Sequence, residues 1–494
     1  MQTYLGQKGY TISKKDLTAD QQKQTRLALT IKPYVMGGND GKTYPVYRES
    51  ANKFYVPHYY GVANFGSPNE YRIPEGDDIN LVFNGQLRDY QEPVVNKFVE
   101  HCFNAKYGGG LLELYCAWGK TSATLNIITR FKKKTLVIVH KEFLMNQWIE
   151  RIRQFLPDAR VGKIQGPIVD IENKDIVIAM LQSLSMKDYP SSLFESFGFT
   201  VIDEVHHISS EVFSNALFKI VTKYMLGLSA TMTRKDGTTN VFKMFLGDIV
   251  YKSKRDNDRF VLVQAIEYKV DDDDFNEVKL DFRGKPQYST MISKLCEYNR
   301  RSEFIIQVLK NLLNDENNHQ IMILAHNKNV LKYLHDAIAH RNIATVGYYV
   351  GGMKESALKI SETKKVIIAT YAMASEALDI KTLTTLIMAT PKTDIEQSVG
   401  RILREKHSSP LVVDIVDSHS LFKNQFAKRK TFYKKENYKI IYTTSHKYST
   451  DYSKWTTLFT PKNMDDVNID LDFDLDEDLD EDKDTKKVEC WLKF

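Results

Sequence analysis

The chain has 494 residues, of which 42% are hydrophobic and 27% charged, and this length predicts roughly three domains. The composition excludes a fibrous or wholly disordered protein, no run approaches the ~20 apolar residues of a membrane-spanning helix, and the first residues lack the apolar segment of a secretory signal. The net charge is only +5, but residues 465–484 hold twelve Asp or Glu and one Lys, so the rest of the chain carries +16 and suits a polyanionic partner.

Residues 1–82 are rich in Tyr, Pro and Gly, with alternating segments such as LALTIKP and KFYVPHYYG. This pattern predicts a small, strand-rich accessory domain. Its aromatic side chains either form a core of their own or contact nucleic acid, and both interpretations stay open at this point. The four cysteines are scattered without a CxxC pair, which argues against a disulfide framework or a zinc cluster and favours a reducing, intracellular compartment.

Eight short runs rich in Val and Ile follow, separated by helical patterns, and most of them end at polar or small residues. Apolar strands that alternate with helices predict parallel sheets covered on both faces, with ligands at the carboxyl ends of the strands. Because the runs form two sets of about four, we expect two doubly wound α/β domains, at residues 83–254 and 255–450. The runs are KTLVIVH, DIVIAML, FTVIDE, KYMLGLSAT, QIMILAH, KKVIIAT, TTLIMAT and PLVVDIVD.

A run of four aspartates, Asp271–Asp274, lies near the expected boundary between these two domains. It is either a metal site or a solvated linker. We expect the linker, because contiguous like charges repel one another and remain exposed.

The segment LYCAWGKT (residues 114–121) follows an apolar run and precedes a helical pattern. Such a turn presents backbone N–H groups and a helix N-terminus to phosphates, so Lys120 would reach the β and γ phosphates and the Thr121 hydroxyl would ligate Mg²⁺. The full pattern GxxxxGK[ST] is not met, because Leu114 stands at its first glycine, and a chance match remains an alternative.

Two acidic residues, Asp203 and Glu204, follow the apolar strand FTVI. In this position Asp203 would hold the Mg²⁺ shell through water, and Glu204 would polarise the attacking water. The next histidines, His206 and His207, do not form an HExxH metal motif, and adjacent side chains point apart, so joint metal ligation is not expected.

Two arginines, Arg401 and Arg404, lie in QSVGRILR. If this segment is helical, both share one face and would act as arginine fingers toward the γ phosphate from across a cleft. A surface ion pair is the alternative for each arginine alone. The order of the segments argues for the functional interpretation: a phosphate loop, an acidic pair, Ser229-Ala230-Thr231, and then a second sheet that ends in the arginine pair.

In this order of motifs the chain resembles a superfamily 2 DEAD/DEAH-like helicase of the XPB/UvsW-like branch, close to the poxvirus transcript-release type of helicase in large DNA viruses. The resemblance covers residues 85–445 and implies two tandem RecA-like domains. LRDYQ (87–91) is similar to the adenine-recognition motif, LYCAWGKT to motif I and DEVH to motif II. HKEFLMNQW, MLQS, SAT, ILAHNKNVLKYL, EALDI and QSVGRILR are similar to the remaining motifs. Arg234-Lys235-Asp236-Gly237 resembles a duplex-separating element in which Lys235 replaces the usual Glu.

The resemblance assigns a role to each matching residue. It places catalysis on Lys120, Asp203, Glu204, Arg401 and Arg404. It places ATP binding on Arg88, Gln91, Cys116, Ala117, Trp118, Gly119, Lys120, Thr121 and Asp379, with Mg²⁺ held by Thr121 and Asp203. It places nucleic-acid contacts and their coupling to hydrolysis on Lys141, Gln147, Gln182, Ser229, Thr231, Arg234, Thr370 and Gln397.

The resemblance implies an ATP-dependent helicase or translocase, with DNA favoured as substrate, working as a monomer in transcription, repair or recombination, alongside proteins of those processes. An RNA helicase or transcript-release translocase is the alternative, and an ATP-gated nucleic-acid-binding scaffold without unwinding is a further one. A viral chain of this kind would work in the host cytoplasm or the virion. The basic and aromatic residues of RKTFYKKENY (429–438) either pack as a helix or line a strand channel.

Residues 451–494 are expected to form a mostly disordered acidic tail, because alternating acidic and apolar residues cannot build a packed core. The more apolar VECWLKF at its end either docks on a surface or remains disordered with the rest.

Overall fold

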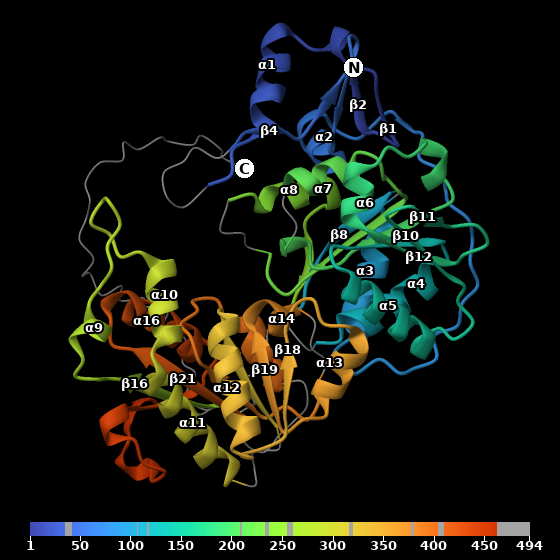
Figure 1. Cartoon of the computed structure of the whole chain (residues 1–494). Helices are drawn as coiled ribbons and strands as arrows, with labels where there is room; N and C mark the ends of the chain where they lie inside the picture. The colour runs from blue at the N-terminus through green and yellow to red at the C-terminus, as the bar shows by residue number, and fades with distance from the viewer. Residues whose placement is uncertain are drawn as a thin grey trace.

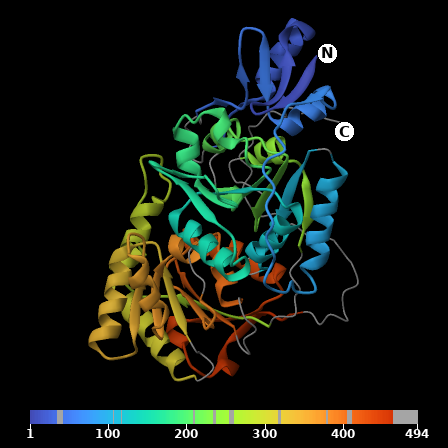
Figure 2. The same ribbon diagram turned by 90° about the vertical axis from the view of Figure 1, so that its right-hand side faces the viewer.

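The computed structural model describes residues 1–34, 42–105, 107–115, 118–207, 210–232, 237–253, 260–315, 320–376, 380–403 and 410–461. Within them the chain forms a five-stranded sheet near the N-terminus, a short two-stranded sheet, and two eight-stranded sheets (Figure 1). We call the eight-stranded sheets, with the helices that cover them, domain 1 and domain 2. Figure 2 shows the N-terminal sheet stacked on domain 1, with domain 2 on the opposite side of domain 1.

The N-terminal module is built on the sheet order β5-β6-β2-β1-β7. Its strands are β1 (Thr3–Gly6), β2 (Gly9–Ser13), β5 (Arg48–Glu49), β6 (Lys53–Val56) and β7 (Glu70–Tyr71), its helices are α1 (Ala19–Ala28) and α2 (His58–Phe65), and β3 (Thr30–Ile31) pairs with β4 (Tyr44–Pro45) beside them. Tyr10 and Phe54 are fully buried in its hydrophobic cluster. These two aromatics therefore serve the module's own core.

Domain 1 has the sheet order β11-β10-β12-β9-β13-β14-β8-β15, in which only the pairing of β11 with β10 is antiparallel among the described strands. Its strands are β8 (Gly108–Glu113), β9 (Thr135–Val139), β10 (Val161–Gln165), β11 (Ile168–Asp170), β12 (Ile176–Met180), β13 (Phe199–Ile202), β14 (Tyr224–Ser229) and β15 (Ile249–Lys252). Its helices are α3 (Glu92–Asn104), α4 (Lys120–Phe131), α5 (Glu142–Phe155), α6 (Leu181–Met186), α7 (Ser210–Leu217) and α8 (Thr239–Leu246).

Both faces of the domain 1 sheet are covered. Along β9, Val137 and Val139 belong to one buried cluster, and Leu136 and Ile138 belong to the cluster on the other face. A strand buried on both sides has no polar alternation, which explains why it appears as a continuous apolar run in the sequence.

Domain 2 has the sheet order β18-β19-β17-β20-β21-β16-β22-β23, with only β23 antiparallel among the described strands. Its strands are β16 (Leu262–Tyr268), β17 (Ile321–Ala325), β18 (Val346–Tyr349), β19 (Val366–Thr370), β20 (Thr385–Met388), β21 (Leu411–Asp417), β22 (Lys439–Thr444) and β23 (Thr456–Phe459). Its helices are α9 (Asp273–Asn276), α10 (Tyr288–Glu297), α11 (Asn299–Leu313), α12 (Lys328–His340), α13 (Glu355–Glu362), α14 (Tyr371–Glu376), α15 (Glu396–Val399) and α16 (Ser420–Lys435).

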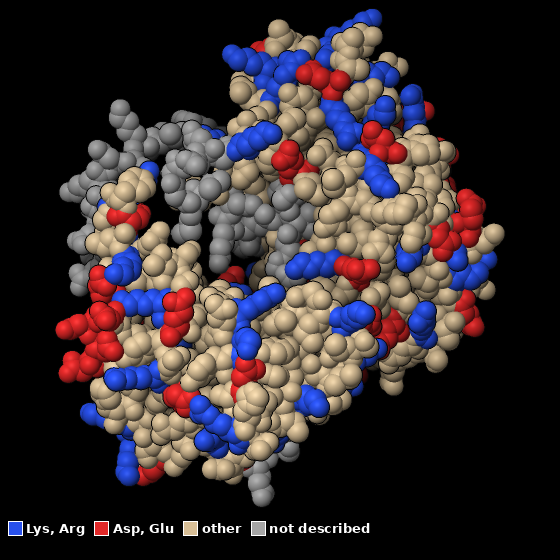
Figure 3. All heavy atoms as spheres, viewed as in Figure 1, with Lys and Arg blue, Asp and Glu red and all other residues tan. Residues whose placement is uncertain are grey.

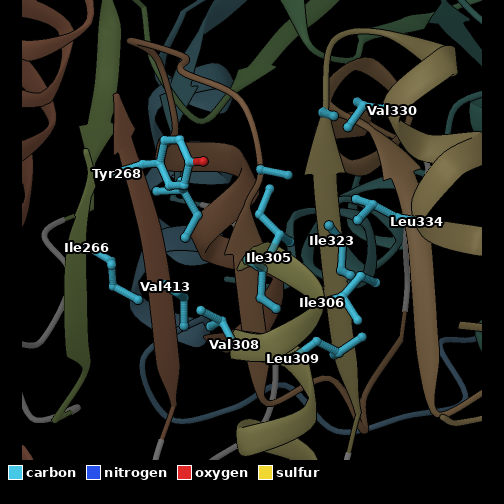
Figure 4. Packing of buried hydrophobic residues seen from close by; sticks show 14 of the residues in the cluster. Ile266, Tyr268, Ile305, Ile306, Val308, Leu309, Ile323, Val330, Leu334 and Val413 are labelled. Atoms are coloured by element: carbon cyan, nitrogen blue, oxygen red, sulfur yellow. The ribbon is translucent and has the colours of Figure 1, made fainter. Parts of the chain in front are cut away.

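In domain 2, too, apolar side chains of the helices pack against apolar side chains of the sheet. In Figure 4, Ile305 and Leu309 of α11 pack against Ile323 of β17 and Val413 of β21. Arg429 of α16 is almost fully buried and forms a two-pronged ion pair with Asp414, at 2.7 and 2.8 Å. Residues 429–435 of RKTFYKKENY therefore pack as the last turns of helix α16, through Arg429 and Tyr433, whose hydroxyl also donates to Asp414.

The predicted α/β class, with two doubly wound sheets, is confirmed, and two expectations about its edges are wrong. The run Asp271–Asp274 is not a linker between the domains, because it follows β16, which lies inside the second sheet between β21 and β22. Asp272 instead caps α9 by accepting a hydrogen bond from the Phe275 N–H at 3.1 Å.

The tail does not begin at residue 451, because β23 pairs with β22 and Trp455 is buried. The acidic residues 465–484 and VECWLKF lie outside the described residues. Among the helices that the structure describes, none has the length and apolar character needed to cross a bilayer.

Candidate ATP site and nucleic-acid interface

The phosphate loop connects β8 to α4, and Gly119 closes it with φ +93°. A Cβ at this position would lie 2.3 Å from the Gln91 side-chain nitrogen, so both the backbone conformation and the packing require glycine. Lys120 and Thr121 are the first residues of α4, whose N-terminal N–H groups face the carboxyl edge of the sheet. Cys116 and Ala117 lie outside the described residues.

Gln91 is buried and connects the segment LRDYQ (87–91) to this loop. Its amide accepts a hydrogen bond from the Arg88 N–H at 3.0 Å and donates one to the Trp118 carbonyl at 2.9 Å. The Trp118 ring is itself buried and lies 5.6 Å from the Tyr90 ring, between centroids. The bulky residue in the loop is thus accommodated by packing against the segment that precedes α3.

The acidic pair follows β13, directly across from Lys120. The Lys120 ammonium donates to Glu204 Oε1 at 2.7 Å, and the Glu204 N–H donates to Asp203 Oδ1 at 3.0 Å. Glu204 has φ +50°, a conformation that non-glycine residues seldom adopt and that is concentrated at functional sites. The turn therefore places both carboxylates and the lysine at one carboxyl edge.

Asp203 accepts a hydrogen bond from the indole N–H of Trp148, on α5, at 2.9 Å. Burial and the neighbouring Glu204 charge raise the pKa of Asp203 to about 6. A carboxylate in this situation is a suitable ligand for a divalent cation, because the cation supplies the positive charge that the site needs. The chemistry of the Asp203 carboxylate therefore fits Mg²⁺.

His206 joins the two domains, a role that the sequence analysis missed when it considered the histidines only as metal ligands. Its Nδ1 lies 2.6 Å from the Ser229 hydroxyl and 3.4 Å from Glu204 Oε2, and its Nε2 lies 3.0 Å from the Gln397 amide nitrogen. Because the Gln397 N–H donates to Nε2, the proton of a neutral ring is on Nδ1. The Thr231 N–H donates back to the Ser229 hydroxyl at 3.2 Å.

The residues expected to contact nucleic acid in domain 1 lie around the start of α5. Lys141 is the N-cap of this helix, and burial lowers the pKa of its ammonium group. The exposed Gln182 donates to the His140 carbonyl at 2.8 Å, which brings the segment MLQS beside the segment HKEFLMNQW. Gln147 is partly buried farther along α5.

Helix α5 also contacts domain 2 directly. The Asn146 amide donates to Glu355 of α13 at 3.1 Å, and Phe143 packs against the hydrophobic cluster of domain 2. The helix that carries Trp148 thus reaches the second domain through its first two turns.

In domain 2, Thr370 ends β19 and Arg401 lies in a 3₁₀ turn, Gly400–Leu403, that follows α15. The segment is helical as far as Leu403, but it changes from an α-helix to a 3₁₀-helix after Val399. The Arg401 Nε–H donates to the Ala374 carbonyl at 2.7 Å, within domain 2 itself. Arg234, Asp379 and Arg404 lie outside the described residues.

The surface shown in Figure 3 is of mixed charge. Lys and Arg side chains lie among Asp and Glu over all the described parts of that face. On the described part of this face, therefore, the Lys and Arg side chains are not gathered into one patch.

Comparisons with known proteins identify the family of this chain. Residues 84–234 match the family described as "Type III restriction enzyme, res subunit". A protein of Acanthamoeba polyphaga mimivirus, named "Putative ATP-dependent RNA helicase L396", is 35% identical, over 90% of this chain and 88% of the relative. "Putative ATP-dependent RNA helicase QP509L" of African swine fever virus (isolate Pig/Kenya/KEN-50/1950) is 28% identical, over 74% and 76%. The solved fragment of "a putative HsdR subunit of a type I restriction enzyme" from Vibrio vulnificus shares the fold, with a TM-score of 0.52 and 14% identity over 74% of this chain and 70% of that one.

Proposed function

Because this chain belongs to the superfamily 2 helicases, and within them to the helicases of large DNA viruses, its activity is that of an ATP-dependent helicase, and we propose that it couples ATP hydrolysis to movement along DNA. The observation that carries the coupling is a path of polar contacts from the phosphate loop to domain 2. It runs from Lys120 to Glu204 at 2.7 Å, from Glu204 to His206 at 3.4 Å, and from His206 to Gln397 at 3.0 Å.

The proposed ATP site uses the carboxyl edge of domain 1. Lys120 binds the β and γ phosphates, and α4 presents its N-terminal N–H groups to them. Gln91 and Arg88 are assigned to the adenine side, and the hydrogen bond from Gln91 to the Trp118 carbonyl holds this segment beside the loop. Glu204 orients and polarises the attacking water, and its ion pair with Lys120 exchanges for contacts with substrate. Bound Mg²⁺ would neutralise charge on the phosphates, with Asp203 and Thr121 as the residues that hold it.

Domain 2 contributes the second half of the proposed cycle. Arg401 is assigned to the γ phosphate as an arginine finger, and Arg404 and Asp379 are assigned to the same nucleotide. Reaching a nucleotide requires the Arg401 guanidinium to exchange its contact with the Ala374 carbonyl, so ATP binding and domain closure are linked. In this proposal the two motor domains are residues 83–254 and a second domain that begins at residue 255 and ends with β23, and residues 1–82 form an accessory domain.

The proposed nucleic-acid path crosses both domains. Lys141, Gln147 and Gln182 contact the strand from domain 1, Thr370 contacts it from domain 2, and Arg234 is placed at the duplex junction. Ser229, Thr231 and Gln397 relay hydrolysis through His206. Contacts of this kind go to phosphates, so binding is independent of sequence and weakens with salt.

RNA is the second candidate substrate, and the printed names of the mimivirus and African swine fever virus relatives favour it. The +16 body suits either polyanion. In either case we propose a monomer that works in a reducing, intracellular setting, in transcription or repair.

The test is the ATPase rate of the full chain with single-stranded DNA, duplex DNA and RNA. We expect stimulation by at least one nucleic acid, and loss of activity in Lys120→Ala and Glu204→Gln. Lys332→Ala is the matched control, because it removes a lysine that is 74% exposed and an ion pair on the surface of α12 that contributes little.

Absence of stimulation by every nucleic acid would refute the motor and leave the ATP-gated scaffold. Stimulation by RNA alone would replace DNA with RNA as the substrate.

A further inference from the structure

A short hairpin, residues 279–287, leaves domain 2 between α9 and α10. Its arms are joined by backbone hydrogen bonds from Gln287 to Lys279 at 2.8 Å and from Asp281 to Lys285 at 2.7 Å. At the turn, Gly284 has φ +71°, and the Asp281 carboxylate accepts from the N–H groups of Arg283 and Lys285 at 2.8 and 2.9 Å. These bonds hold the tip in one conformation.

The tip presents an aromatic ring and two cations to solvent. Phe282 is 90% exposed, and the Arg283 guanidinium lies 5.0 Å from the centre of its ring. Neither Arg283 nor Lys285 forms an ion pair with any residue that the structure describes. The Asp281 carboxylate of the hairpin is engaged with backbone N–H groups, which hold its pKa below the ordinary range. The tip therefore displays positive charge around an exposed ring.

The hairpin rises from the functional edge of domain 2. It leads directly into α10, whose first residue, Tyr288, donates its hydroxyl to the Pro391 carbonyl at 3.3 Å. Pro391 follows β20 at the carboxyl edge of the sheet, the edge at which Thr370 ends β19. In Figures 1 and 2 the loop between α9 and α10 extends beyond the body of domain 2 on the side of domain 1.

We propose that Phe282 stacks on a base of the nucleic-acid strand that the helicase holds, while Arg283 and Lys285 contact the phosphates beside that base. The chemistry fits single-stranded nucleic acid, because an aromatic ring stacks on any base and cations on either side follow the backbone. A rigid tip also loses little conformational entropy on stacking. This proposal rests on the proposed function and adds to it a base contact that none of the helicase motifs contains.

The test uses the full chain and short single strands of DNA and RNA that carry the fluorescent base 2-aminopurine at each position in turn. Stacking on Phe282 quenches the fluorescence at one position. Phe282→Ala removes that quenching and weakens binding roughly tenfold, the order expected for loss of one stacked base. Phe282→Trp retains both the quenching and the binding affinity. The matched control is Phe260→Ala, which removes another exposed phenylalanine, 55% accessible, away from the hairpin.

A second variant distinguishes the contribution of the two cations to binding from that of the Phe282 ring. The double change Arg283→Gln and Lys285→Gln keeps the quenching but lowers the slope of log affinity against log salt by about 1.4, since each phosphate contact on a single strand contributes ~0.7.

Unchanged quenching and affinity in Phe282→Ala would overturn the stacking proposal and leave a protein as the partner of the tip. That outcome is distinct from failure of the proposed function, which is judged by whether nucleic acid stimulates the ATPase of the unmodified chain.

Discussion

Asp203 shows how one residue depends on its neighbours. Its carboxylate is buried and lies beside Glu204, and both conditions disfavour its charge. The Trp148 indole N–H and the Glu204 backbone N–H compensate by donating to its two oxygens. Since Trp148 fixes the orientation of the carboxylate that is assigned to Mg²⁺, we regard it as a positioning residue.

We predict that Trp148→Phe raises the Mg²⁺ concentration needed for half-maximal ATPase several-fold and lowers the free energy of unfolding by about 1–3 kcal/mol, because Asp203 Oδ2 loses a buried donor. Magnesium titration and thermal unfolding measure the two effects. Trp455→Phe is the matched control, because it also removes a hydrogen bond of an indole N–H, to the Ser449 carbonyl at 3.0 Å, far from the site. An equal magnesium shift in both variants would contradict the positioning role.

His206 and Gln397 form a pair that acts across the domain boundary. We predict that His206→Ala and Gln397→Ala each lower the nucleic-acid-stimulated ATPase rate, and that the double variant is hardly worse than His206→Ala alone. The reason is that both changes remove the same contact. A double-mutant cycle on the stimulated rate measures this coupling, and simple additivity of the two losses would show that the contact does not transmit hydrolysis.

At the scale of elements, the start of α4 depends on a glycine. We predict that Gly119→Ala reduces ATP affinity at least tenfold, because the added Cβ meets Gln91 at 2.3 Å and the residue must keep φ +93°. Gly166→Ala is the control, since Gly166 also has positive φ but no atom lies within 4 Å of an added Cβ. Equal ATP affinity in the two variants, by equilibrium binding of a fluorescent ATP analogue, would refute the packing argument.

The strands that the sequence predicts are those that are buried on both faces. All eight apolar runs form strands, whereas β16 was missed because it contains Gln264 and Glu267. Glu267 is buried, and the structure neutralises it with Lys423 at 3.0 Å and with the Tyr442 hydroxyl, from segments more than 150 residues away. Edge strand β23 was missed because its side chains are mostly exposed and carry no burial pattern.

In the candidate site, too, some residues could be predicted from the sequence and others could not. Local motifs predicted Lys120, Asp203 and Glu204, because a phosphate loop and an acidic pair are each formed by residues that are adjacent in the sequence. The contacts of Trp148 with Asp203 and of His206 with Gln397 join positions 55 and 191 residues apart, so only the fold reveals them.

At the scale of the whole molecule, charge is divided between a body of +16 and a segment of −11 at residues 465–484. A polyanionic segment tethered to the body competes with nucleic acid for the same cations. Because this competition is electrostatic, it acts over about 10 Å at 0.1 M salt and fades as salt rises. The segment follows β23, so removing it leaves the edge of the domain 2 sheet intact.

We therefore predict that deletion of residues 465–494 tightens binding to a short nucleic acid at low salt, by several-fold, with the two affinity curves converging at high salt. Fluorescence anisotropy across a salt titration measures the effect. A full-length variant in which the twelve acidic residues become Asn or Gln serves as the control for chain length. If charge is the cause, the affinity of this variant should match that of the deleted chain. Equal affinity of the deleted and unmodified chains at every salt concentration would refute competition.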